Sequence, residues 1–201
     1  MRIESAVSLR QLYGQASGRS LQKQLSCLEK HSIEFISLSP FMVLSTYSKE
    51  GAVDSSPRGG EPGFARLINP TKIAIADARG NNRLDSLINI VETAKVGCLF
   101  MIPGVDETLR VNGAAYISVS EEDLQYSCGD KNPPKSVIII EIEEVFLHCA
   151  KSMMRSKLWC PESIQHRSVL PSMGQMIRDQ VGDTGPVETQ QEMVSRYKNQ
   201  L

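Results

Sequence analysis

The sequence has few aromatic residues and almost no net charge. Aromatic side chains make up 5% of the 201 residues, which is too few for a surface that stacks nucleic-acid bases. The formal net charge is -1, so no overall positive field would draw the protein to nucleic acid or to an anionic membrane. We therefore expect neither of these partners, and a small-molecule ligand or substrate instead.

Paired cysteines and long apolar runs are also missing. None of the five cysteines lies in a C-x-x-C spacing, so the pattern indicates neither a zinc site nor a disulfide framework. No uncharged apolar run approaches the roughly 18 residues of a membrane helix. The opening residues MRIESAVSLRQLYG carry charges where a signal peptide has an apolar core. We expect a cytoplasmic protein.

Known catalytic and metal-binding motifs do not occur. The sequence contains no G-x-S-x-G and no H-E-x-x-H, and His31 and His166 have no patterned partner. His148 and Cys149 are neighbours in a strand-like run, where adjacent side chains point to opposite faces. We therefore expect no metal site. If the protein is an enzyme, its reactive atoms belong to a cofactor.

The apolar pattern predicts mostly short strands joined by tight turns. Helical spacing marks residues 20–38, and Pro40 ends that helix. Hairpin turns are indicated at 49–51 and 69–71. The strand-like runs are residues 41–56, 64–78, 96–102, 107–119 and 135–149.

Three short helices are predicted beside these strands. Apolar residues at intervals of three and four mark an amphipathic helix, namely Leu84, Leu87, Ile88 and Val91. Ser120 is expected to cap a second helix, with acidic residues in its first turn. The pattern is helical again from Ala150 to Trp159, and the remaining residues are polar and poorly periodic.

This arrangement indicates the fold class. About six strands with hairpin connections are antiparallel neighbours, and closing the sheet protects its edges. We predict an α+β, mainly β fold, a six-stranded antiparallel split β-barrel with flanking helices. We expect a single domain over 1–201, with a helical N-terminal segment (about 1–38), a barrel (about 39–148), and a C-terminal helix and tail (149–201).

A strand–turn–helix junction at residues 75–87, IADARGNNRLDSL, is the first candidate site. Unpaired N–H groups at a helix start suit a phosphate, and Arg79 and Arg83 add charge-assisted donors. We expect Arg83 in the first helical turn, and Asn81 or Asn82 as its cap. The alternative is an ordinary capped helix with two solvated arginines.

Three further stretches carry candidate residues. In SSPRGG, Arg58 stands among glycines that let a ligand approach the backbone, and the alternative is a plain loop. In TLRVN, Thr108, Arg110 and Asn112 share one strand face, as a ligand groove or a solvated face. Lys151, Arg155 and Trp159 recur every four residues, as a ligand-binding helix face or an ordinary surface.

Taken together, these segments resemble the pyridoxamine 5′-phosphate oxidase-like, FMN-binding split-barrel superfamily, in its branch of flavin-nucleotide-binding proteins. The resemblance runs from about Leu38 to Trp159. It is carried by SPFMVLST, SSPRGGEPGF, ARGNNRLDSLINI, LFMIPGVDETLRVNGAA and FLHCAKSMMRSKLW, in that order.

The resemblance implies a homodimer with one FMN in each of two grooves at the subunit interface. Arg83 would hold the phosphate, with Asn81, Asn82 and Asp77 nearby. The preceding strand pair would contribute Ser56, Pro57, Arg58 and Gly59, and Thr108 with Arg110 would lie at the polar edge of the flavin ring. The second subunit would contribute Lys151, Arg155 and Trp159.

The implied function is that of an FMN-dependent oxidoreductase acting on a small molecule, in which flavin N5 accepts or donates hydride. Two departures speak against oxidation of pyridoxamine phosphate itself. Arg83 is followed by Leu84 and not by lysine, and the chain ends in SRYKNQL without a substrate-gripping arginine. The alternatives are a non-catalytic flavin or haem binder or carrier, and a scaffold that has lost its cofactor.

Overall fold

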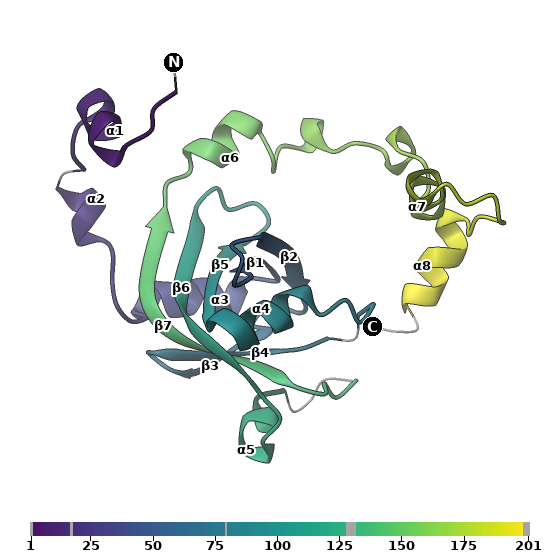
Figure 1. Ribbon diagram of the computed structural model, residues 1–201, viewed down its shortest axis with the longest axis horizontal. Helices are drawn as coiled ribbons and strands as arrows, with labels where there is room; N and C mark the ends of the chain where they lie inside the picture. Colours follow the sequence, from purple (N-terminus) through teal and green to yellow (C-terminus); the bar gives the residue numbers. More distant parts are fainter. Residues whose placement is uncertain (1, 17, 79, 128–131, 199–201) are drawn as a thin grey trace.

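The computed structural model describes residues 2–16, 18–78, 80–127 and 132–198. Its centre is one antiparallel sheet in the order β2-β1-β5-β6-β7-β4-β3, which curls around the core (Figure 1). The strands are β1 (Phe41–Tyr47), β2 (Val53–Gly59), β3 (Ala65–Asn69), β4 (Lys72–Ala76), β5 (Lys95–Met101), β6 (Thr108–Ser118) and β7 (Val137–His148).

The strand-like runs of the sequence all form strands, but the prediction of a six-stranded barrel is only partly confirmed. The sheet has seven strands and is not closed, because β2 and β3 remain as its two edges. Pro57 lies inside β2, opposite Val43 of β1. Proline, which lacks an N–H donor, is tolerated there because an edge strand has one unpaired side.

Alternation along the strands places the core. In β1, Met42 and Leu44 are buried while their neighbours point outward. β7 begins with four consecutive buried residues, Val137 to Ile140, because α5 (Glu121–Leu124) and η1 (Gln125–Ser127) cover its second face. The prediction that Ser120 caps α5 is confirmed, since its hydroxyl accepts from Asp123 N.

The helix expected over residues 20–38 is interrupted. It divides into α2 (Arg19–Gln22) and α3 (Lys30–Leu38), after α1 (Ala6–Tyr13). Leu25 leaves the helical path to form a bridge with Val145 of β7. The Glu29 carboxylate then caps α3 by accepting from the N–H groups of His31 and Ser32.

Helix α4 (Asp85–Thr93) forms where the spacing predicts one, but most of its apolar stripe points away from the core. Ile90 is buried together with two polar residues, Ser86 and Asn89. Of the predicted stripe, Leu87 packs against the core. The other three members, Leu84, Ile88 and Val91, are exposed.

The chain continues beyond the sheet as a curved series of short helices (Figure 1). These are α6 (Lys151–Ser156), η2 (Pro161–Ser163), η3 (Arg167–Val169), α7 (Met173–Val181) and α8 (Gln190–Lys198). The prediction of a helix through Trp159 was too long, because Lys157 ends α6 in the left-handed conformation. In the described part of the chain, no helix has the length and apolar character needed to cross a membrane.

Candidate functional site

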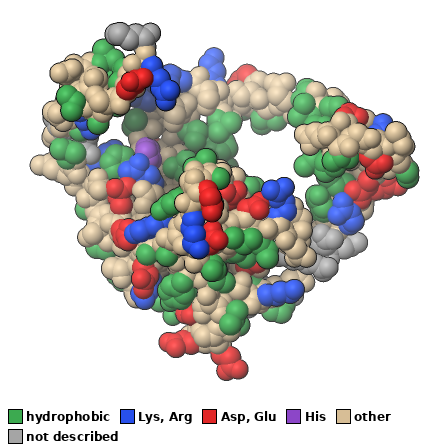
Figure 2. Space-filling model, viewed as in Figure 1, with side chains coloured by type: hydrophobic (Ala, Val, Ile, Leu, Met, Phe, Trp, Pro, Cys, Tyr) green, Lys and Arg blue, Asp and Glu red, His purple; other side chains and the backbone are tan. Residues whose placement is uncertain are grey.

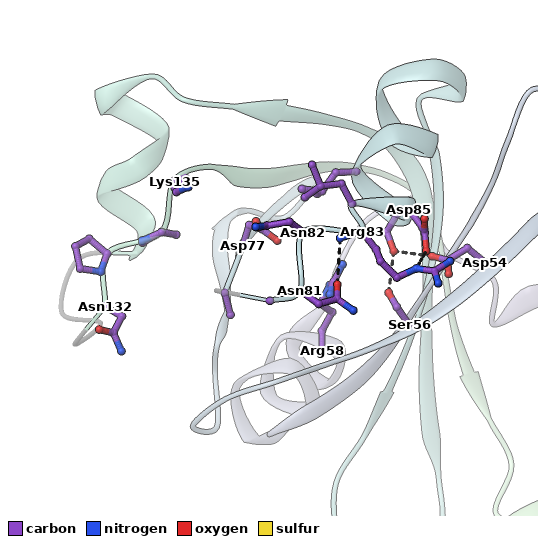
Figure 3. Close-up of a pocket in the computed structure, with 17 residues that line it drawn as sticks. Asp54, Ser56, Arg58, Asp77, Asn81, Asn82, Arg83, Asp85, Asn132 and Lys135 are labelled. Atoms are coloured by element: carbon purple, nitrogen blue, oxygen red, sulfur yellow. Dashed lines mark hydrogen bonds and ion pairs between the residues drawn. The ribbon is translucent and has the colours of Figure 1, made fainter. Parts of the chain in front are cut away.

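Two clefts contain most of the candidate residues. The first cleft has a volume of about 760 Å³ and lies between β2, the loop after β4, the start of α4 and residues 132–135 (Figure 3). The second cleft, of about 620 Å³, lies between β5, β6 and α6. Ser56, Arg58, Asp77, Asn81, Asn82 and Arg83 line the first cleft, and Thr108, Arg110, Lys151 and Arg155 line the second.

The alternation of β2 decides which residues of SSPRGG face the first cleft. Asp54, Ser56 and Arg58 are half-buried and line it. Pro57 and Gly59 occupy the intervening positions, are exposed, and do not line the cleft. We therefore correct the prediction of a continuous ligand wall, because only alternate residues of an extended strand face one side.

The loop before α4 adopts an unusual backbone. Asn82 and Leu84 both have φ of 60°, a left-handed conformation that costs a leucine roughly 1–2 kcal/mol. The Asn81 side chain accepts from the N–H of Arg83 at 3.1 Å. Strain of this kind concentrates at binding sites, where surrounding structure holds it in place.

Two predictions about this loop are wrong. Arg83 lies before α4 and not in its first turn, and neither asparagine caps the helix. Leu84 occupies the cap position and makes no side-chain cap hydrogen bond, so the first N–H groups of α4 lie uncapped beside the cleft. Arg79, also a candidate, lies outside the described residues.

Arg58 is the cation of the first cleft that is buried without a partner. Its Nε is buried and has no hydrogen-bond partner among the described residues. Burial raises the pKa of the Asp77 carboxyl, and the charge of Arg58 opposes that rise. Arg83, by contrast, is exposed and pairs with Asp85 at 2.8 Å between Nε and Oδ2.

A hydroxyl network beneath the first cleft holds α4 on the sheet (Figure 3). Ser86 Oγ donates to Asp54 Oδ2 at 2.6 Å and lies 2.8 Å from Ser56 Oγ. Asn89 Nδ2 donates to Thr46 Oγ1 at 2.9 Å. Sequence reasoning missed this network, because its members are dispersed over three elements and their polarity suggests an exposed position.

Lys135 was also missed as a site residue. It reaches the first cleft from the segment before β7, opposite Arg58 and Arg83 (Figure 3). No local motif marks it, since only the pairing of β4 with β7 brings this segment to the cleft.

The second cleft is built around a fixed arginine. Arg110 Nη2 donates to Glu144 Oε1 at 2.6 Å, and its guanidinium lies 4.9 Å from the centre of the Phe146 ring. Asn112 Nδ2 donates to the same Glu144 oxygen at 3.0 Å. The shared face predicted for Thr108, Arg110 and Asn112 therefore exists and borders a cleft.

Positive charge gathers in the second cleft. Lys151 and Arg155 line it from α6, as their four-residue spacing predicts. Burial lowers the pKa of His148, and the nearby charges of Arg110 and Lys23 lower it further. Trp159 lines neither described cleft. It lies beyond the end of α6, where its indole N–H donates to the carbonyl of Val105 at 2.9 Å.

The first cleft fits a phosphate better than the second. An arginine with an unengaged buried donor, a lysine and an uncapped helix start converge there. In the second cleft, Glu144 and Phe146 already hold the arginine. Bidentate arginine contacts and helix N–H groups are the donors that phosphate oxygens accept from.

Comparison with known proteins gives one family match. Residues 28–149, more than half of the chain, match the family model described as pyridoxamine 5′-phosphate oxidase. No curated protein is similar enough to count as a match.

Solved structures show the same fold at low sequence identity. Two crystal structures of HupZ from Group A Streptococcus are 19% identical to this chain, with TM-scores of 0.51 and 0.50. They cover 60% of this chain and 98% or 94% of HupZ. A proposed pyridoxamine 5′-phosphate oxidase from Lactobacillus delbrueckii is 19% identical over 62% of this chain and 98% of its own, with a TM-score of 0.49.

Proposed function

We propose that this chain, which belongs to the pyridoxamine 5′-phosphate oxidase family, binds FMN with the phosphate in the first cleft. The observation that carries the proposal is the buried Arg58 Nε without a hydrogen-bond partner among the described residues, beside the uncapped start of α4. A buried donor without an acceptor is costly. A phosphate oxygen would supply the acceptor.

The roles of the residues follow from their positions. Arg58 would donate to the phosphate from β2, and the first N–H groups of α4 would donate from the opposite wall. Arg83 would turn from Asp85 toward the same oxygens, and Lys135 would add charge from a third side. Asn81 and Asn82 would shape the loop, and Asp77 would orient Arg58.

The remaining candidates enter the proposal through a homodimer. FMN would lie at the subunit interface, and the second cleft of the partner would face its ring with Thr108, Arg110, Lys151 and Arg155. Trp159 would approach from the same side. Pro57 and Gly59 would keep β2 in place, since a Cβ at position 59 would lie 3.1 Å from the carbonyl oxygen of Pro40.

The proposed activity is oxidoreduction of a small molecule, with flavin N5 as hydride donor or acceptor. The chain itself would bind the cofactor, orient its ring and exclude water. To test this, the purified protein is examined for a flavin spectrum, the released nucleotide is identified by mass, and reduction by nicotinamide nucleotides is followed anaerobically. A protein that fails to bind added FMN contradicts the proposal.

The second cleft favours one alternative, a non-catalytic haem binder or carrier. A lowered pKa keeps His148 uncharged, which is the form that ligates haem iron, and three cations beside it would suit haem propionates. A Soret band on reconstitution that disappears in His148→Ala supports this alternative. Bound flavin that no donor or oxygen turns over supports a flavin carrier.

A further inference from the structure

Residues 161–198, which we call the C-terminal arm, lie outside the segment that matches the family. The arm has a well-defined structure. Ser172 caps α7 through the N–H of Gln175, and Arg196 makes two hydrogen bonds with Glu188, at 2.9 and 2.7 Å. Helices α7 and α8 pack on each other and not extensively on any strand of the sheet.

The arm exposes many apolar side chains. None of its helices has a buried residue among those described. Eight large apolar residues are between 38% and 76% exposed, namely Ile164, Val169, Leu170, Met173, Ile177, Val181, Val194 and Tyr197. Figure 2 shows an opening through the molecule between the arm and the barrel, with hydrophobic side chains along its border. Water would fill this opening in an isolated chain.

The exposed apolar area is close to what a stable dimer needs. Burying one side chain of this size removes roughly 100 Å² of apolar surface, so eight half-exposed residues offer about 400 Å² for each arm. Two arms and the surfaces they cover would bury about 1,600 Å², which is the usual size of a specific interface.

Helix α4 offers a matching surface, which we call the α4 face. It consists of Leu84, Ile88 and Val91, which are between 48% and 74% exposed. These residues follow a four- and three-residue spacing and form one stripe. In α7, Met173, Ile177 and Val181 form a comparable exposed stripe at intervals of four. Paired stripes of this kind are typical of helix–helix packing.

We propose that the C-terminal arm of each copy packs on the α4 face of a second copy of this chain. A twofold axis makes the exchange reciprocal, so that each chain supplies one arm and one α4 face. Within one chain, the arm curves past α4 without packing on it (Figure 1). The second copy thereby fills the opening and covers both apolar stripes.

This arrangement completes the first cleft. Leu84 belongs both to the α4 face and to the wall of the cleft, so the arm of the second copy would shield the cleft from water. Shielding strengthens charge-assisted hydrogen bonds to a bound anion. The inference stands on the arm and on α4, and it does not require that the anion be FMN.

The test uses two full-length variants with opposite charges. We expect the wild type to be a dimer by light scattering or sedimentation, without added ligand. Ile177→Lys and Ile88→Asp each place an unpaired charge in the contact and raise the dimer dissociation constant at least about 100-fold. Asp179→Lys, on the opposite side of α7 from Ile177, serves as the matched control and stays dimeric.

Mixing the two variants decides between a partner and the same chain. In the mixed dimer, Lys at 177 meets Asp at 88 in one contact, and the other contact is wild type. We expect dimers to return, within about tenfold of the wild-type affinity. Monomers after mixing, or a monomeric wild type, overturn the inference. If Ile177→Lys does not fold by circular dichroism, Val181→Lys replaces it.

The result is separable from the proposed function. Dimers that form through the arm but bind no FMN uphold the inference and contradict FMN binding. FMN bound by a wild-type monomer does the reverse.

Discussion

The two clefts use a similar arginine in different ways. In both, one arginine has a buried Nε without a partner among the described residues. Glu144 and Phe146 hold Arg110 in the second cleft, whereas Arg58 makes no ion pair with any described residue and only feels the charge of Asp77. An arginine already held supports the wall, while one not held is available to an anion.

Replacing Arg58 gives the largest expected effect on this contrast. Arg58→Ala removes a charge-assisted donor group from the proposed phosphate site, and such hydrogen bonds contribute about 1.5–3 kcal/mol each. We expect FMN affinity to fall about 100-fold, measured by quenching of flavin fluorescence. Arg83→Ala should cost only about tenfold, because Arg83 is exposed and already paired with Asp85. The reverse order would contradict these roles.

Replacing Arg110 tests the other half of the comparison. Arg110→Ala leaves the half-buried Glu144 carboxylate with Asn112 as its remaining described partner. We expect a loss of about 1–3 kcal/mol in the free energy of unfolding, measured by urea denaturation. Arg58→Ala should change that free energy little. Equal losses in the two variants would remove the distinction between a held and an available arginine.

The hydroxyl network beneath the first cleft has a smaller expected effect. Ser86→Ala removes the hydroxyl that joins Asp54 to Ser56. We expect a loss of about 1 kcal/mol in the free energy of unfolding, together with a few-fold weaker FMN binding because α4 is held less firmly. Ser86→Thr keeps the hydroxyl and serves as the control. Unchanged stability in Ser86→Ala would show that the network contributes nothing.

Asp77 gives the smallest effect, and its sign depends on pH. Burial raises the pKa of its carboxyl in the folded state, so stability is greatest below the ordinary pKa and declines as pH rises through the raised value. Asp77→Asn cannot lose a proton and should raise Tm at pH 7 by about 1–2 °C. The difference should vanish at a pH below the ordinary pKa of an aspartate, about 3.9. A larger gain at acid pH would have the wrong sign.

The sequence was most informative where apolar residues alternate. Alternation in β1 and the β-branched run of β7 located these strands, and the turn residues located the hairpins. Alternation along β2 could also have separated Arg58 from Pro57, had residues 57–59 been predicted as strand. The glycines around them favoured a loop, and the pairing with β1 prevailed.

Helix α4 shows why the rest could not be predicted. Its spacing indicated the helix, yet Leu84, Ile88 and Val91 are exposed while Ser86 and Asn89 are buried. Partners from β1 and β2, distant in sequence, satisfy these two polar side chains. A single sequence does not show such long-range hydrogen bonds, and it does not show that a second chain is needed to cover an apolar stripe.

The most direct test of phosphate binding in the first cleft compares FMN with riboflavin, which lacks the phosphate. Equilibrium dialysis of the wild type should show FMN bound at least about 100-fold more tightly. The double variant Arg58→Ala/Arg83→Ala should bind both flavins equally and weakly. A wild type that does not distinguish the two flavins, or a preference for FMN that survives in the double variant, would contradict the account.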